Sequence, residues 1–299
     1  MNPAVLALLC CSAVVLVVTG VAAASGLSVL IGWDPGNCGA RQLARERLTF
    51  LVQATVRVVL AFQLLSLFLF VATTDRLHQL FTGAMCAAGT LNAHPLGYPT
   101  LLVKLAAFVS CGVWLVVNRA SPTATSTGVI RFKQLFLLGV FAVLLAENIL
   151  QFRYFSALDP EILTSCCATI FGGASEGLGS DLATLPVRES RIVFAGVLAL
   201  TLGVGVRSLV RDRSPALFAV LALVLGVVSI VAVVTWIAPG FYQLPNHHCP
   251  FCLLAPEYGS VGYLMYGLLF VAVLAGGSAG LVRCLRAVDS LGSITPMAE

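Results

Sequence analysis

The sequence predicts an all-α, polytopic membrane protein with about seven transmembrane helices. Of its 299 residues, 59% are hydrophobic and only 10% are charged, whereas a soluble domain carries about 25% charged residues. The mean hydropathy is +0.98. The apolar residues are gathered into long runs, and about 20 apolar residues suffice for a helix to cross a bilayer. We therefore expect a single transmembrane helical domain over residues 1–299, with the lipid bilayer as its solvent.

Seven apolar runs are long enough to span a membrane. They cover residues 4–31, 50–73, 100–118, 134–155, 191–210, 215–238 and 260–283. Cys10, Cys11 and Cys111 lie inside such runs, and we expect them to be small buried apolar side chains. The net charge of +4 is small for this length, so it gives no indication of a nucleic-acid partner.

The basic residues predict the orientation of the helices, because Arg and Lys are enriched in cytoplasmic loops. They gather in the segments after the first, third, fifth and seventh runs: Arg41, Arg45 and Arg47; Arg119, Arg131 and Lys133; Arg207, Arg211 and Arg213; Arg283 and Arg286. These segments alternate, so all four can face the cytoplasm together. We expect the N-terminus outside and the C-terminus inside, in the inner membrane of the cell.

The other three connections, residues 74–99, 156–190 and 239–259, are then extracytoplasmic. They hold all four His and five of the ten Cys of the chain. The charge rule that fixes the orientation takes no account of Cys or His, so this segregation is independent information. It is the strongest indication of function in the sequence.

The segment from Asn246 to Tyr258, NHHCPFCLLAPEY, contains the most concentrated chemistry of the chain. Two thiols at this spacing, Cys249 and Cys252, either close a disulfide or bind one soft metal ion. Pro250 suits the first position of a helix, and a Cys at a helix N-terminus has a lowered pKa. We expect Cys249 to be the attacking thiolate, tuned by the neighbouring His247 and His248.

The motif Cys249-Pro250-Phe251-Cys252 resembles the redox motif of membrane thiol oxidoreductases of the vitamin K epoxide reductase and DsbB class. The resemblance implies that Cys249 and Cys252 exchange electrons with a quinone. It also implies that Cys166 and Cys167 pass electrons to an extracytoplasmic thiol protein. Exchange needs direct contact between sulfurs. We therefore expect the exterior loops to converge and to bring Cys166 and Cys167 within reach of Cys249, with the sulfurs of these loops within roughly 10 Å of one another.

Two other functions remain open, and whether the chain is an enzyme is left undecided. The first is a module that binds or transports a soft metal ion, Cu or Zn. Its expected ligands are Cys86, His94, His247, His248, Cys249 and Cys252. The second is an accessory subunit of a membrane complex whose disulfides are structural, since disulfides persist outside the cytoplasm. The CPFC pair favours redox exchange, which is our leading hypothesis.

Two charged residues lie inside the apolar runs. Lys104 and Glu147 occupy the third and fourth runs at compatible depths. A charge at membrane depth is costly unless it is paired or solvated. We therefore expect the two side chains to pair, either as a structural ion pair or as part of a proton relay.

Overall fold

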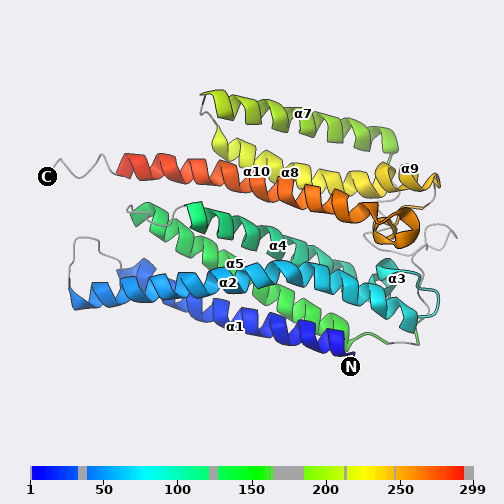
Figure 1. The fold of residues 1–299 in the computed structure, drawn as a ribbon, viewed down its shortest axis with the longest axis horizontal. Helices are drawn as coiled ribbons and strands as arrows, with labels where there is room; N and C mark the ends of the chain where they lie inside the picture. Colours follow the sequence, from blue (N-terminus) through cyan, green and yellow to red (C-terminus); the bar gives the residue numbers. More distant parts are fainter. Residues whose placement is uncertain are drawn as a thin grey trace. The chain divides into compact units, whose positions relative to one another are not determined.

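The structure is a computed structural model. Among the residues that it describes, every element of regular secondary structure is a helix (Figure 1). The structure describes residues 2–32, 39–120, 127–159, 161–162, 164, 185–211, 214–245 and 247–292. Within these ranges there is no β-strand, and seven helices are long and apolar enough to cross a membrane. The predicted all-α, polytopic membrane fold is confirmed. The orientation, N-terminus outside, stays a prediction.

The long helices match the seven predicted runs and extend beyond most of them. They are α1 (Pro3–Gly32), α2 (Ala40–Leu77), α4 (Gly97–Ala120), α5 (Thr127–Ser156), α7 (Val187–Arg211), the continuous series α8 (Pro215–Ala232), η2 (Val233–Ile237) and α9 (Ala238–Tyr242), and α10 (Val261–Gly292). For α2 the extension is ten residues at the N-terminal end, where Ala, Arg, Gln, Leu and Glu are strong helix formers that do not depend on lipid.

Within the described residues, short helical turns connect the long helices at two places. The first connection holds η1 (His78–Leu80) and α3 (Ala87–Asn92), and the second holds η3 (Cys252–Leu254) and η4 (Pro256–Tyr258). Both connections carry the Cys and His residues singled out above.

The chain divides into two compact units. The first comprises residues 1–69, 101–152 and 281–299, and the second comprises residues 70–100 and 153–280. The expectation of one domain over the whole chain stays a prediction.

The first unit has an apolar core to which α1, α2, α4 and α5 all contribute. Its buried members are Val15, Ala22, Val56, Leu60, Ala107, Cys111, Trp114, Leu137, Val140 and Leu144. The predicted burial of Cys111 is confirmed. For Cys10 and Cys11 it is wrong, because both are exposed. The buried stripe of α1 passes through Leu8, Ser12 and Val15, and Cys10 and Cys11 fall outside this helical periodicity.

In the second unit α8 lies between α7 and α10 (Figure 1), and glycines allow close packing. A Cβ on Gly226 of α8 would lie 2.6 Å from Val273 Cγ2 of α10, and one on Gly276 of α10 would lie 2.6 Å from Ala222 Cβ of α8. Association of helices in a membrane relies on such small residues, because lipid supplies no hydrophobic drive between helices.

The sixth span contains a π-helical segment, η2, just before Pro239. Here the N–H of Ala238 donates to the carbonyl of Val233, five residues back. Pro239 has no N–H, so the next π-helical hydrogen bond, to the carbonyl of Val234, cannot form. His248 supplies the missing donor, with its Nδ1 2.9 Å from that oxygen. Because a carbonyl only accepts, Nδ1 of His248 carries the proton.

Candidate functional site

Three cysteine sulfurs meet in the second unit. Cys86 Sγ lies 3.5 Å from Cys249 Sγ, and the sulfurs of Cys86, Cys249 and Cys252 all lie within 4.8 Å of one another. We call these three residues the thiol group. Cys86 follows the second long helix and the other two follow the sixth, so the predicted convergence is confirmed for these two loops. Cys166 and Cys167 lie outside the described residues.

Cys86 is positioned by the hydrogen bonds that hold α3. The N–H of Ala87 donates to Asp75 Oδ1 at 3.1 Å, and the hydroxyl of Thr90 donates to the carbonyl of Thr74 at 2.8 Å. The hydroxyl of Tyr154 donates to the carbonyl of Thr90 at 2.9 Å. These bonds tie α3 to the end of α2 and to α5, so Cys86 is held on a rigid support.

Thr164, in the connection 156–190, is hydrogen-bonded to the connection that holds Cys86. The N–H of Thr164 donates to the carbonyl of Thr82 at 3.1 Å, and its hydroxyl donates to the carbonyl of Gly89 at 2.8 Å. Between these contacts lies Gly83, which has a φ of 89°. A Cβ on Gly83 would overlap the carbonyl oxygen of Thr164. Glycine is therefore required at position 83 for two reasons: its backbone has a positive φ, and a side chain would overlap Thr164.

We expect Gly83→Ala to lower the stability of this loop contact. A positive φ costs an L-residue about 1–2 kcal/mol, and the overlap with Thr164 adds to that cost. The measurement is thermal unfolding in detergent together with limited proteolysis of the loop 156–190. Gly259→Ala is the matched control, since Gly259 has a φ of 68° but open space around its Cβ position. Equal effects of the two substitutions would show that Thr164 does not contact Gly83.

Cys249 and Cys252 do not stand at the start of an α-helix. The segment forms only the short turns η3 and η4, and α10 begins at Val261. Between the motif and α10, Pro256 and the left-handed residues Gly259 and Ser260 prevent a continuous helix. The expectation that a helix dipole activates Cys249 is therefore wrong.

The electrostatic environment of Cys249 also differs from the prediction. A hydrogen bond to Cys252, which stabilises the protonated thiol, and burial raise the pKa of Cys249 from 9.0 to about 12, although a hydrogen bond from Cys86 acts in the opposite direction. Cys249 is 7% exposed, as is Cys86, whereas Cys252 is half-buried. The surroundings of Cys249 therefore favour its protonated thiol, and Cys252 is the most exposed residue of the thiol group.

Two tyrosines hold the backbone beside Cys249. The hydroxyl of Tyr242, at the end of α9, donates to the carbonyl of Cys249 at 2.8 Å. The hydroxyl of Tyr266, in α10, donates to the carbonyl of Pro250 at 2.8 Å. Nothing in the sequence pattern marks these tyrosines as part of the site, because each lies within or beside an apolar run.

The histidine nitrogens do not belong to the group of possible metal ligands, which within the described part of the chain consists of the three sulfurs. Nδ1 of His94 accepts the N–H of Leu96 at 3.1 Å, and Nδ1 of His248 is bonded to the carbonyl of Val234. The ring of His247 packs against Tyr242 at 4.7 Å, and burial and the neighbouring His248 lower its pKa. Three of the six predicted metal ligands are therefore brought together, and the imidazoles are not among them.

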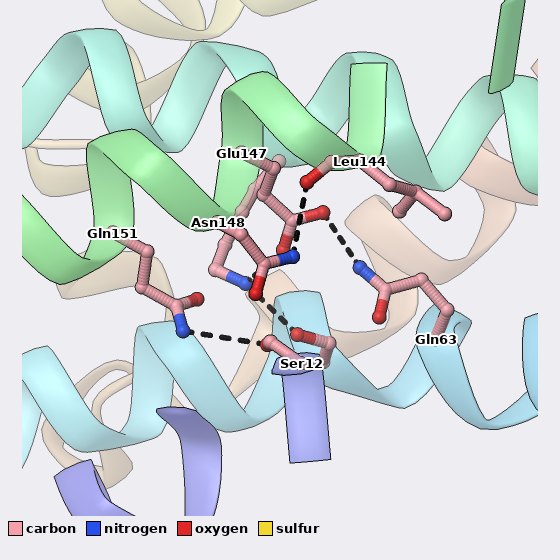
Figure 2. Close-up of polar contacts among 8 residues, drawn as sticks. Ser12, Gln63, Leu144, Glu147, Asn148 and Gln151 are labelled. Atoms are coloured by element: carbon pink, nitrogen blue, oxygen red, sulfur yellow. Dashed lines mark hydrogen bonds and ion pairs between the residues drawn. The ribbon is translucent and has the colours of Figure 1, made fainter. Parts of the chain in front are cut away.

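A second buried polar group lies in the first unit. Lys104 Nζ is 2.5 Å from Glu147 Oε1 and donates to Ser66 Oγ at 2.8 Å. Figure 2 shows Gln63 of α2 directed at the carboxylate of Glu147, where its Nε2 donates to Oε2 at 2.6 Å. The predicted pairing of Lys104 and Glu147 is confirmed. Gln63 and Ser66, which the sequence analysis missed, are recognisable as polar residues inside an apolar run.

The polar stripe continues one turn along α5. Gln151 reaches across to α1, where its Nε2 donates to Ser12 Oγ at 3.3 Å (Figure 2). Glu147 and Gln151 are both fully buried. Hydrogen bonds between helices satisfy polar side chains that would otherwise face hydrocarbon.

No family model, curated protein or solved structure matches the chain.

Proposed function

We propose that the protein is a membrane thiol–disulfide exchange protein whose reactive centre is the thiol group Cys86, Cys249 and Cys252. The observation that carries this proposal is the meeting of three sulfurs from two distant loops within 4.8 Å of one another. A thiol attacks a disulfide by direct contact, so sulfurs at this spacing exchange a disulfide after small side-chain movements.

The accessible Cys252 is the sulfur that meets a partner. Its thiolate attacks a partner disulfide, forms a mixed disulfide and releases one partner thiolate. Cys249 then attacks Cys252, which forms the Cys249–Cys252 disulfide and releases the second partner thiolate. The protein loses two protons and two electrons from its thiols. The partner disulfide takes them up and becomes two thiols. The reaction is reversible and needs no other reactant.

Cys86 gives the centre a further step. Its thiolate attacks Cys249, forms the Cys86–Cys249 disulfide and returns Cys252 to the thiol state. The disulfide is then buried and Cys252 is again accessible. This step depends on the separation of 3.5 Å between the two sulfurs, and it changes neither the number of disulfides nor the number of electrons.

The location and the further partners of the centre follow from the charge rule and the motif. In our proposal the thiol group faces the extracytoplasmic side of the inner membrane and meets an extracytoplasmic thiol protein or a subunit of a membrane complex. Cys166 and Cys167 are proposed as the shuttle pair on the resemblance of the motif alone. A quinone is the electron acceptor that the resemblance implies, and we assign no residue to it.

A second candidate is supported by the spacing of the same sulfurs. A thiolate sulfur lies about 2.3 Å from Zn²⁺, so sulfurs that share a tetrahedral ion are about 3.8 Å apart. The separation of 3.5 Å between Cys86 and Cys249 is close to this value. Three thiolates also suit Cu(I). In this alternative the thiol group binds a soft metal ion without the histidines.

We expect protein purified without reductant to contain no stoichiometric metal and to have two of the three thiols of this group joined in a disulfide. The measurements are elemental analysis and a free-thiol count by peptide mass spectrometry, before and after reduction. Readily reducible disulfide between Cys249 and either Cys252 or Cys86 supports exchange. One equivalent of Cu or Zn, with all three thiols resistant to alkylation until a chelator is added, would establish the metal function instead. A disulfide that resists mild reductant would point to a structural cross-link.

A further inference from the structure

We infer that His248 is a positioning residue of the thiol group: its hydrogen bond to the carbonyl of Val234 holds the loop of Cys249 on the sixth span and so aligns Cys249 with Cys86. This inference rests on the proposed exchange function. It gives the imidazole of His248 a role that needs neither a metal ion nor a change in its own charge.

The carbonyl of Val234 needs a donor from outside its own helix. Val234 is 7% exposed, and the N–H of Ala238 is used by the carbonyl of Val233. The next residue, Pro239, has no N–H. A buried carbonyl without a donor is costly, and among the described residues it is His248 Nδ1 that meets this one, at 2.9 Å. The bond between the loop and the helix is therefore favoured at this one carbonyl.

The backbone of Cys249 is held to the same helical series on both of its sides. His248, the residue before it, is bonded to Val234. The carbonyl of Cys249 itself accepts the hydroxyl of Tyr242 at 2.8 Å. Val234 and Tyr242 belong to the continuous series α8, η2 and α9. Two attachments on either side of one Cα fix the direction of its side chain, and this direction brings Cys249 Sγ to 3.5 Å from Cys86 Sγ.

The π-helical segment that receives His248 is itself held in place by α7. The hydroxyls of Thr235 and Ser190 are hydrogen-bonded at 2.8 Å. The ring of Trp236 packs edge-on against Phe194, with their centroids 5.9 Å apart. The carbonyl of Val234 thus lies on a segment that other side chains hold, so a bond to it restrains the loop. Single-turn π-helical segments inside α-helices are frequent at functional sites.

The test measures how fast Cys86 and Cys249 form a disulfide when the reduced full-length protein in detergent is treated with diamide. Peptide mass spectrometry is the readout, and Cys252→Ser is the parent variant, so that Cys86 is the partner left to Cys249 within the thiol group. We expect His248→Ala in this parent to form the disulfide about fivefold more slowly, the factor that roughly one hydrogen bond is worth.

His248→Asn should restore nearly the parent rate. The amide nitrogen of Asn is the same number of bonds from the backbone as Nδ1 of His and also donates. Because Asn carries no charge, this rescue separates holding the loop from tuning a thiol electrostatically. Gln243→Ala is the matched control: the side chain of Gln243 also donates to a carbonyl of this helical series, that of Gly240 at 3.1 Å, but it is exposed and lies outside the motif. Its rate should equal that of the parent.

Pro239→Ala separates the two consequences of losing His248. An alanine at this position supplies the backbone N–H that the carbonyl of Val234 lacks, but it does not reattach the loop. We therefore expect His248→Ala to lower the unfolding temperature, and the double variant Pro239→Ala/His248→Ala to recover most of that loss while its disulfide still forms slowly.

A rate that recovers together with the unfolding temperature would overturn the inference, because His248 would then act only by satisfying a carbonyl. A parent rate in His248→Ala would overturn it as well. If His248→Ala does not fold, His248→Asn and the double variant decide. Exchange of the wild-type protein with glutathione disulfide is measured in parallel. Wild-type protein that fails to exchange while the His248 variants still slow the disulfide would refute the proposed function and keep the positioning role.

Discussion

Changing Cys249 to serine is expected to abolish the net transfer of two electrons, because the reaction stops at the mixed disulfide with Cys252. Cys249 Sγ lies 3.5 Å from Cys86 Sγ and within 4.8 Å of Cys252 Sγ. In the proposed series of steps, every disulfide formed within the thiol group includes Cys249. A serine hydroxyl is nearly the same size but forms no disulfide. The measurement is the exchange of electrons between the purified protein and a dithiol or disulfide probe, such as dithiothreitol or glutathione disulfide.

The other thiols and the histidines should give graded results. Cys252→Ser should also abolish exchange, because it removes the accessible sulfur. Cys86→Ser should allow the first exchange and block the transfer of the disulfide to the buried position. His247→Ala and His248→Ala should only weaken the reaction, because imidazoles tune the site and form no covalent bond with the partner.

Cells that express Cys249→Ser should accumulate a mixed disulfide between Cys252 and the natural partner, since the thiol that would release it is missing. Cys284→Ser is the control, because Cys284 is in α10 outside the thiol group. Loss of function in His247→Ala as severe as in Cys249→Ser would contradict the exchange mechanism, in which His247 forms no covalent bond.

The fold was predictable because membrane helices depend on length and hydropathy, which are properties of single segments. In lipid every backbone polar group must be satisfied within its own helix, so a run such as 191–210 predicts α7 without knowledge of its neighbours. Details that depend on neighbours were missed. The burial of Cys10 and Cys11 depends on which face of α1 packs against other helices, and the π-helical segment η2 depends on Pro239 and on a donor from His248.

The sequence predicted which loops carry the candidate site, but it did not predict how the side chains of the site are arranged. Segregation of Cys and His pointed to the correct connections, and Cys86, Cys249 and Cys252 do meet. The predicted activation of Cys249 was wrong because it assumed that Pro250 starts an α-helix. The left-handed residues Gly259 and Ser260 end the short turns that follow Pro250, and α10 begins only after them. Tyr242 and Tyr266 were not found, because a tyrosine in an apolar run carries no sign of the carbonyl that it binds.

Replacing Lys104 with methionine is expected to destabilise the protein by about 3–5 kcal/mol, because a buried charge loses its partner. Glu147 is fully buried. In the variant, Gln63 would be the only donor to its carboxylate among the described residues. Glu147→Leu should be comparably harmful, since it removes the carboxylate that neutralises the buried ammonium of Lys104. The measurement is unfolding of the purified protein in mixed micelles.

The double variant Lys104→Met/Glu147→Leu separates a structural ion pair from a proton relay. Removing both charges restores electrical neutrality with apolar groups of similar size, so stability should return to near the wild-type value or exceed it. The geometry favours the structural role, because both carboxylate oxygens already accept hydrogen bonds from Lys104 and Gln63. We therefore expect the double variant to retain thiol–disulfide exchange. A double variant as stable as wild type but unable to exchange would show that the pair takes part in the reaction, and the proton relay would then be the better account of Lys104 and Glu147.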